Sequence, residues 1–250
     1  MKLRELTGYL DDYLRIADVP DYRGAYNGLQ VEGGDELTKV VTAVDACAAV
    51  IDAAAAAGAS ILLVHHGLFW GDTAPLTGAR FQRVAALISA GISVYSAHLP
   101  LDVHPEVGNN ALLTRALGLH PEGTFGAFEG HPIGIWSHGK GTREELAAQL
   151  AEVLRATPLL MPFGPAVPKR IGVITGGAGS MIKVAHEAGV DTFITGEGAH
   201  HTFFDAEELG INVFYGGHYA TETFGVRSLG EHISHRFGLA VEFIDHPTGL

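Results

Sequence analysis

Two pairs of stretches in this 250-residue sequence align with each other, which suggests that one folding unit occurs twice. Residues 56–67 (AAGASILLVHHG) align without a gap with residues 187–198 (EAGVDTFITGEG). Residues 90–102 (AGISVYSAHLPLD) align with residues 209–222 (LGINVFYGGHYATE), with one extra residue in the second copy. In each stretch a helix end, a glycine turn and a short apolar strand follow one another, as in β-α-β units. The chain is therefore predicted to contain a duplicated α/β unit.

Apolar runs and glycine turns predict similar elements in the two copies. The first copy is expected to contain helices at 1–17, 46–57 and 79–90 and strands at 39–44, 60–64 and 92–96. The second is expected to contain strands at 169–175, 192–195 and 211–215 and helices at 180–188, 201–208 and 221–236. Alternation of strands with helices predicts an α/β fold with a mainly parallel sheet and right-handed connections.

The segment between the copies differs from both of them. Residues 121–168 contain a predicted strand at 132–137, a helix at 142–156 and a connector with four prolines. Thr142 and Glu145 form a capping-box pattern at the start of that helix. We therefore divide the chain into a first repeat (1–120), a short elaboration on one face with its connector (121–168), and a second repeat (169–250), which is expected to complete a functional site together with the first.

Composition argues against several classes of protein. The chain is 47% hydrophobic and 18% charged, which is typical of a globular protein. Its net charge of -12 disfavours general attraction to nucleic acid or to an anionic membrane. A single cysteine, Cys47, cannot form an intrachain disulfide, so a cytoplasmic location is expected. The amphipathic start of the sequence is not typical of a signal peptide, and no segment is expected to span a membrane.

Imidazole and carboxylate side chains follow several of the predicted strands. His65 and His66 directly follow the strand predicted at 60–64, and in the aligned repeats His98 matches His218 and Asp102 matches Glu222. Strand ends of α/β sheets are where ligand sites form. Six nitrogen and oxygen ligands without a thiolate favour a pair of divalent transition-metal ions, namely Zn, Mn, Fe, Co or Ni. The candidate metal ligands are His65, His66, His98, Asp102, His218 and Glu222.

Each of these residues also has an ordinary structural explanation. His98 could be a core histidine, Asp102 a turn or helix cap, His218 a loop residue, and Glu222 a partner of a helix dipole. Their coincidence at matching places in a duplicated unit favours the metal site. Two further residues, Glu197 and His104, are candidates for moving protons. The stretch 176–180 (GGAGS) could bind an anion through its amides, although it lacks the lysine of a P-loop.

Five stretches, taken in order, resemble those of a known family. They are NGLQVEG (27–33), VHHG (64–67), AHLPLDVHPEVGNN (97–110), TGEGAHH (195–201) and GGHYATET (216–223). The chain thereby resembles the NGG-interacting-factor-three-like dinuclear metal-centre family, whose members are often labelled GTP cyclohydrolase I type 2 homologues. The resemblance implies two intertwined, duplicated α/β repeats with mixed sheets and two metal ions bound by the six candidate ligands. It also implies a ring-shaped homohexamer.

Two functions agree with these observations. The first is a metal-dependent hydrolase, in which two ions lower the pKa of a bridging water and so supply hydroxide at neutral pH. Its small-molecule substrate is open, because a purine ring carbon, an amide and a phosphoester are all compatible with such a centre. The alternative is a non-catalytic metal carrier or regulatory adaptor. Direct DNA binding is disfavoured by the net charge of -12.

Overall fold

The computed structural model describes residues 1–70 and 74–250, which form two compact units. The first unit comprises residues 1–101 and 225–246, and the second comprises residues 102–224 and 247–250. The chain therefore leaves and re-enters each unit. The division by repeats at 1–120, 121–168 and 169–250 describes sequence similarity rather than packing, and it stays a prediction.

The first unit is built on a mixed sheet with the strand order β1-β4-β3-β2-β11. Its strands are β1 (Gly28–Val31), β2 (Lys39–Asp45), β3 (Ile61–His66), β4 (Ser93–Ser96) and β11 (Ala240–Phe243). Strands β11, β2, β3 and β4 run parallel to one another, whereas β1 runs antiparallel to β4. The predicted, mainly parallel arrangement is therefore present in this unit.

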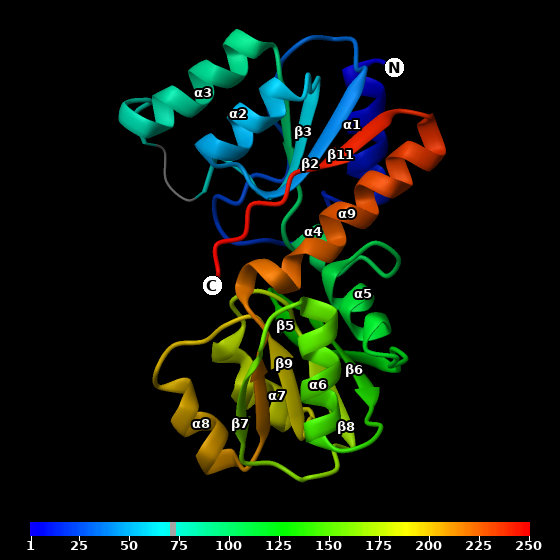
Figure 1. Ribbon diagram of the computed structural model, residues 1–250, viewed down its shortest axis with the longest axis vertical. Coiled ribbons are helices and arrows are strands. Elements are labelled where there is room, and N and C mark those ends of the chain that lie inside the picture. The colour runs from blue at the N-terminus through cyan, green and yellow to red at the C-terminus, as the bar shows by residue number, and fades with distance from the viewer. Residues whose placement is uncertain (71–73) are drawn as a thin grey trace. The chain divides into compact units, whose positions relative to one another are not determined.

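Helices cover both faces of this sheet, which explains why the residues of its central strand are apolar at every position from 61 to 64. The helices are α1 (Leu3–Tyr13), α2 (Ala48–Ala56), α3 (Gly78–Ala90) and the later part of α9 (His218–Phe237). Figure 1 shows α2 and α3 on one side of the strands and α1 and α9 on the other. Val50, Ile51 and Leu87 pack into the core on the first side. On the second side Gly230 of α9 lies against Val241 and Thr42.

The second unit contains a mixed sheet with the strand order β5-β6-β8-β9-β10-β7. Its strands are β5 (Gly123–Phe128), β6 (His131–His138), β7 (Leu159–Pro162), β8 (Arg170–Val173), β9 (Thr192–Thr195) and β10 (Asn212–Tyr215). Strands β8, β9 and β10 are parallel, and β5, β6 and β7 pair antiparallel at the two edges. The segment 121–168 thus contributes the outer strands of this sheet.

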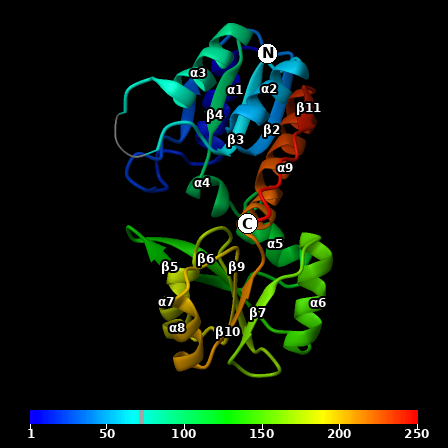
Figure 2. The same cartoon turned by 60° about the vertical axis from the view of Figure 1, so that its left-hand side comes forward.

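Two layers of helices enclose the second sheet. They are α5 (Asn109–Ala116), α6 (Arg143–Leu154), α7 (Ile182–Glu187) and α8 (Thr202–Leu209), with a 3-10 turn at Gly179–Met181. Figure 2 shows α7 and α8 on one side of the strands and α6 on the other, where α5 shares its core cluster. The capping box of α6 is confirmed: Glu145 N donates to Thr142 Oγ1, and Thr142 N donates to Glu145 Oε2.

The fold class predicted from the sequence is confirmed, because both units are mixed α/β structures. Strands β2, β3 and β4 of one unit correspond in order and direction to β8, β9 and β10 of the other. A helix follows the last strand of each set: α4 (Leu99–Asp102) after β4 and α9 after β10. Among the described residues, no helix has both the length and the hydropathy that crossing a membrane requires.

Two predicted boundaries need correction at residues of the candidate site. His65 and His66 do not follow their strand but form its last two residues, because β3 continues to pair with β2 as far as Asp45 and His66. The helix predicted at 221–236 begins earlier, at His218. Gly217, with a φ of 96°, makes the turn that allows the helix to start there. His218 is therefore a helical residue rather than a loop residue.

Candidate metal centre

Three of the predicted ligands meet within the first unit. His65 and His66 end β3, and His98 lies between the end of the neighbouring parallel strand β4 and the start of α4. One possible ligand atom from each of the three side chains lies within 4.8 Å of the others. Parallel strands place their carboxyl ends at one edge of a sheet, so strand order alone brings these histidines together.

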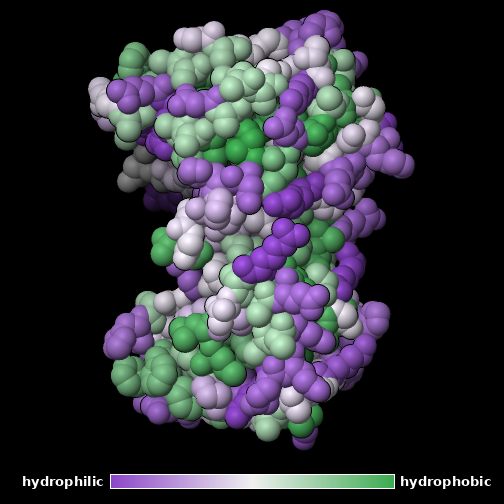
Figure 3. All heavy atoms as spheres, in the orientation of Figure 1, coloured by the Kyte–Doolittle hydropathy of each residue, from purple (hydrophilic) through white to green (hydrophobic). Residues whose placement is uncertain are grey.

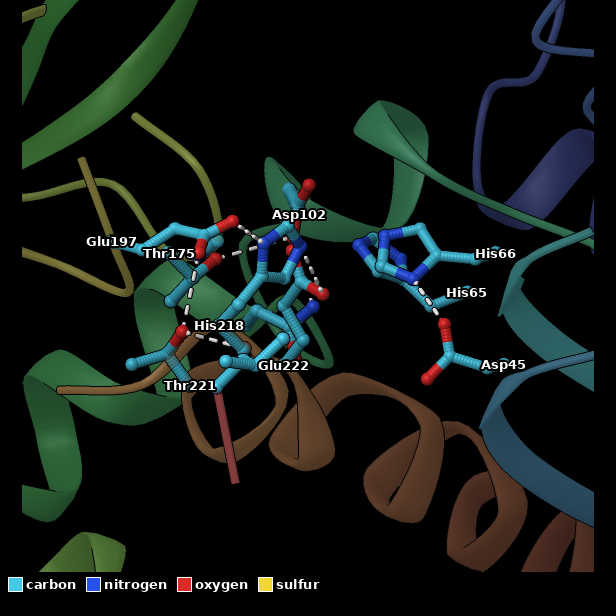
Figure 4. Close-up of polar contacts among 12 residues, drawn as sticks. Asp45, His65, His66, Asp102, Thr175, Glu197, His218, Thr221 and Glu222 are labelled. Atoms are coloured by element: carbon cyan, nitrogen blue, oxygen red, sulfur yellow. Dashed lines mark hydrogen bonds and ion pairs between the residues drawn. The ribbon is translucent and has the colours of Figure 1, made fainter. Parts of the chain in front are cut away.

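A hydrogen bond at Nδ1 orients each of these imidazoles. His65 Nδ1 lies 2.9 Å from the carbonyl oxygen of Ala97. Figure 4 shows the second contact, in which His66 Nδ1 lies 2.8 Å from Asp45 Oδ1. His98 Nδ1 lies 2.8 Å from Asp21 Oδ1. A metal would consequently be bound through Nε2 in all three cases. Metal-binding histidines commonly use this arrangement, in which an oxygen atom holds the other ring nitrogen.

Sequence reasoning missed the two carboxylates in these pairs. Asp45 was detectable, because it follows the predicted strand 39–44 and pairs in register with His66. Asp21 lies in an irregular segment, and no pattern around it predicts a contact with His98. Burial of Asp21 would by itself raise the pKa of its carboxyl group. Hydrogen bonds from His98 and Asn27 outweigh that effect and hold the pKa below its usual value.

The second unit holds a separate group of predicted ligands at the start of α9. His218 Nε2 lies 3.2 Å from Glu222 Oε2 one helical turn later, and His218 Nδ1 lies 2.7 Å from Glu197 Oε1 (Figure 4). The hydrogen bond to Glu222 raises the pKa of His218 to about 9; burial opposes this rise, and Glu197 adds to it. In the absence of a metal, His218 is therefore an imidazolium between two carboxylates.

Asp102 lies close to Glu222 within this unit. Both residues are buried, and an oxygen atom of each lies within 4.8 Å of the other. Asp102 Oδ1 accepts hydrogen bonds from Asn109 Nδ2 at 2.8 Å and from Thr175 Oγ1 at 3.2 Å. Two buried carboxylates at such a separation repel each other unless a proton or a cation lies near them. Their placement fits the binding of a divalent ion.

Gly176 makes room for the Glu222 carboxylate. Its φ is 68°, and a Cβ atom at this position would collide with Glu222 Oε1. Beside it lies a cavity of about 370 Å³. The cavity is lined by Gly177, Gly179, Ser180, Glu197, Gly198, Ala199, His201 and Thr202. Glu197 therefore contacts His218 and also lines a space large enough for a small ligand.

His104, the second residue predicted to move protons, takes part in a turn. It is buried, and its Nδ1 accepts hydrogen bonds from the backbone N–H groups of Glu106 and Val107, both at 3.2 Å. These contacts place the imidazole proton on Nε2 and hold the turn that leads into α5. A role for His104 in proton transfer stays a prediction.

A family model described as Duf34/NIF3 (NGG1p interacting factor 3) matches residues 1–249. The chain belongs to the Duf34/NIF3 family. A relative from Deinococcus radiodurans named GTP cyclohydrolase 1 type 2 homolog is 42% identical over 250 residues, covering 98% of this chain and 94% of that protein. A relative of the same name from Archaeoglobus fulgidus is 41% identical and is covered completely, as is this chain. The family predicted from the sequence motifs is thus confirmed.

Solved structures similar to this Duf34/NIF3 chain have the same fold. The chain superposes on a structure described as protein ybgI, unknown function, with a TM-score of 0.94 and 38% identity, and both chains are fully covered. It also matches the crystal structure of TTHA1606 from Thermus thermophilus with a TM-score of 0.87 and 40% identity, again over both full chains. These likenesses support the mixed α/β assignment.

The side-chain chemistry of both groups fits a transition metal. Neutral imidazole nitrogens and carboxylate oxygens suit ions such as Zn, Mn, Fe, Co and Ni. The first unit supplies three imidazoles, and the second supplies one imidazole and two carboxylates. Every one of the six predicted ligands therefore lies in a group that could bind a metal, although the groups belong to different units.

Proposed function

We propose that this chain is a metal-dependent hydrolase with a dinuclear centre. The ligands in this proposal are His65, His66, His98, Asp102, His218 and Glu222. The observation that carries it is the histidine group of the first unit, in which every Nδ1 contacts an oxygen atom and the rings are oriented to bind through Nε2. The proposal assigns both ligand groups to one pair of ions, as the resemblance to the family implies.

Chain connectivity supports a shared centre. Only three residues separate His98 of the first unit from Asp102 of the second, and they belong to the single turn of α4. One helical turn rises about 5.4 Å, so these two ligands are close neighbours along the backbone, which agrees with the proposal that both serve one centre.

Divalent ions in such a centre supply Lewis acidity and activate water for attack on a polarised substrate. Two residues outside the six ligands have proposed roles in the reaction. Glu197 holds Nδ1 of His218 and lines the adjacent cavity, so we propose that it orients this ligand and exchanges a proton with the bound substrate. We keep His104 as a second candidate for proton transfer, because it is buried and lies two residues after Asp102 in the sequence.

The substrate class is proposed from the relatives and from the cavity. Relatives named GTP cyclohydrolase 1 type 2 homolog make hydrolytic opening of a purine ring the first reaction to test. The cavity beside Glu197 has a volume of about 370 Å³, which is within the range of small-molecule sites. Amides and phosphoesters form the second part of the test panel.

The experiment compares metal-loaded, chelated and reloaded protein on that panel, with metal content determined by elemental analysis. We expect turnover by the loaded and reloaded forms alone. Glu197→Gln should lower kcat by about 10²- to 10⁴-fold if Glu197 transfers a proton, with unchanged metal content. Glu187→Gln, at an exposed position in the same unit, is the control. A loaded protein that is inert toward all substrates would contradict the hydrolase proposal.

A metal carrier or regulatory adaptor is the second candidate. The side chain of His218 is 30% exposed, so an acceptor molecule could reach part of the ligand group. A carrier should transfer its ions quickly to an acceptor chelator, whereas a hydrolase should retain them during turnover. Measuring ion transfer by stopped flow distinguishes the two functions.

We also propose that the chain assembles with itself, as a homohexamer, and acts in the cytoplasm. Figure 3 shows hydrophobic residues gathered over α8, where Phe203 and Phe204 are 41% and 48% exposed. Exposed aromatic groups of this kind often lie in protein interfaces. Light scattering coupled to size-exclusion chromatography should give six times the chain mass of 26.4 kDa, and a monomer mass would contradict the proposal.

A further inference from the structure

We propose that Asp21 is a positioning residue for the metal centre, because it holds the His98 imidazole in the tautomer that presents Nε2 to a metal. This inference rests on the proposed metal-binding function, but it concerns a residue outside the six ligands. Asp21 would not contact the metal itself. It would act through the ring of His98.

The carboxylate of Asp21 receives four hydrogen bonds. Its Oδ1 accepts from His98 Nδ1 at 2.8 Å and from Tyr22 N at 2.7 Å. Its Oδ2 accepts from Asn27 Nδ2 at 2.8 Å and from Leu99 N at 3.0 Å. The side chain is only 5% exposed, so water competes little for these contacts. An ionised carboxylate can only accept, so the proton of the His98 ring must lie on Nδ1.

Asn27 closes a ring of hydrogen bonds around His98. While its Nδ2 donates to Asp21, its Oδ1 accepts from the backbone N–H of His98 at 2.7 Å. The backbone and the imidazole of His98 are thus both attached to the segment 21–27. This explains why an asparagine stands at the start of the NGLQVEG stretch.

The other two histidines of the group provide an internal comparison. Asp45, which contacts His66, has a side chain that is 34% exposed. Among the residues that the structure describes, His66 is the one side chain that forms a hydrogen bond with it. The partner of His65 is a backbone carbonyl, which substitution does not remove. Hydrogen bonds are electrostatically stronger where water is excluded. Removal of the carboxylate charge should therefore lower the metal affinity more at Asp21 than at Asp45.

The test uses the full chain and two measurements. The first is the Zn²⁺ affinity of wild type, Asp21→Asn and Asp45→Asn, measured by competition with a fluorescent chelator. We expect a loss of about 10- to 100-fold for Asp21→Asn, the range typical of partners of metal-binding histidines, and a smaller loss for Asp45→Asn. The control is Asp18→Asn, because Asp18 is an exposed carboxylate of the same region that pairs with Arg15. It should leave the affinity unchanged.

The second measurement is the tautomer of His98 in metal-free protein, read from the ring ¹⁵N shifts and assigned with His98→Gln. Wild type should show a protonated Nδ1, and Asp21→Asn should show a loss of that preference. A wild-type ring protonated on Nε2 alone, or a folded Asp21→Asn variant with unchanged affinity, would overturn the inference. If Asp21→Asn does not fold, the tautomer of His98 in the wild-type protein still tests the inference. Failure of wild type to bind Zn²⁺ would instead overturn the proposed function.

Discussion

His218 Nε2 lies 3.2 Å from Glu222 Oε2, and the two residues are one turn apart at the start of α9. The ion pair is partly withdrawn from water, since the Glu222 side chain is 3% exposed. A proton on His218 therefore balances the carboxylate when no metal is present. A metal ion that binds both side chains must displace this proton, which links metal binding, pH and stability at one pair of residues.

The first prediction concerns the stability of the metal-free protein. The pKa of His218 is raised from 6.5 to about 9, with the Glu222 hydrogen bond as the largest cause. Because the folded-state pKa is raised, the stabilisation is fully present below pH 6.5 and is lost as the pH rises through about 9. Chemical denaturation of wild type and Glu222→Gln at about pH 6 to 10 checks this. The stability difference between them should shrink across that window, and a constant difference would contradict the prediction.

The second prediction concerns proton release on metal binding. At neutral pH His218 is protonated in the metal-free protein, because its pKa is about 9, so binding should release a proton from this side chain. Calorimetry in two buffers of different ionisation enthalpy measures the number released. His218→Gln should release about one proton fewer than wild type, provided that it still binds the ion. An equal release by the two proteins would show that His218 is not a ligand.

The third prediction separates backbone strain from displacement of Glu222. Gly176 and Gly118 have φ values of 68° and 66°, but only at Gly176 would a Cβ atom meet Glu222. Substitution by alanine in this conformation costs about 1–2 kcal/mol. Both Gly176→Ala and Gly118→Ala should therefore lower the Tm, and Gly176→Ala alone should also weaken metal binding. Equal metal affinities for the two variants would show that the space beside Glu222 is not required.

The fourth prediction concerns removal of the metal. An ion present at about 100 times its Kd stabilises the folded state by about 2.7 kcal/mol, so a chelator should lower the Tm of loaded protein. His65→Ala should reduce this chelator-dependent shift. His235→Ala, at an exposed position of α9, should retain it in full. A chelator that leaves the wild-type Tm unchanged would argue against metal binding by the native fold.

The fifth prediction tests the cap of α6. Thr142 Oγ1 accepts from Glu145 N at 3.2 Å, which satisfies a backbone donor in the first turn. Thr142→Ala should lower the free energy of unfolding by about 1 kcal/mol. Thr142→Ser retains the hydroxyl oxygen and should lose much less free energy of unfolding. Urea denaturation at neutral pH measures both variants, and equal stabilities would mean that the cap contributes nothing.

Local patterns in the sequence determined the repeated elements and the predicted ligands. An apolar run between glycine turns identified β3, because burial on both faces favours apolar side chains at Ile61 to Val64. The alignment of 187–198 with 56–67 identified β9, although this strand begins and ends with threonine. The four-residue spacing of His98 and Asp102, repeated in His218 and Glu222, identified candidate ligands because both sets follow a strand. Strand β7 was missed, since Pro162 is typical of a connector, yet proline is tolerated at the sheet edge where this strand lies.

Only the tertiary structure decided which residues support the ligands. Asp21 reaches His98 across 77 positions of sequence, and Glu197 reaches His218 across 21. Neither contact belongs to a helical or strand period, so no local pattern indicates it. Strand order, which depends on how all the apolar faces of a unit are buried together, determines which loops meet at a sheet edge. The types of the candidate ligands are local properties of the chain, whereas their orienting hydrogen bonds arise only after distant segments have packed.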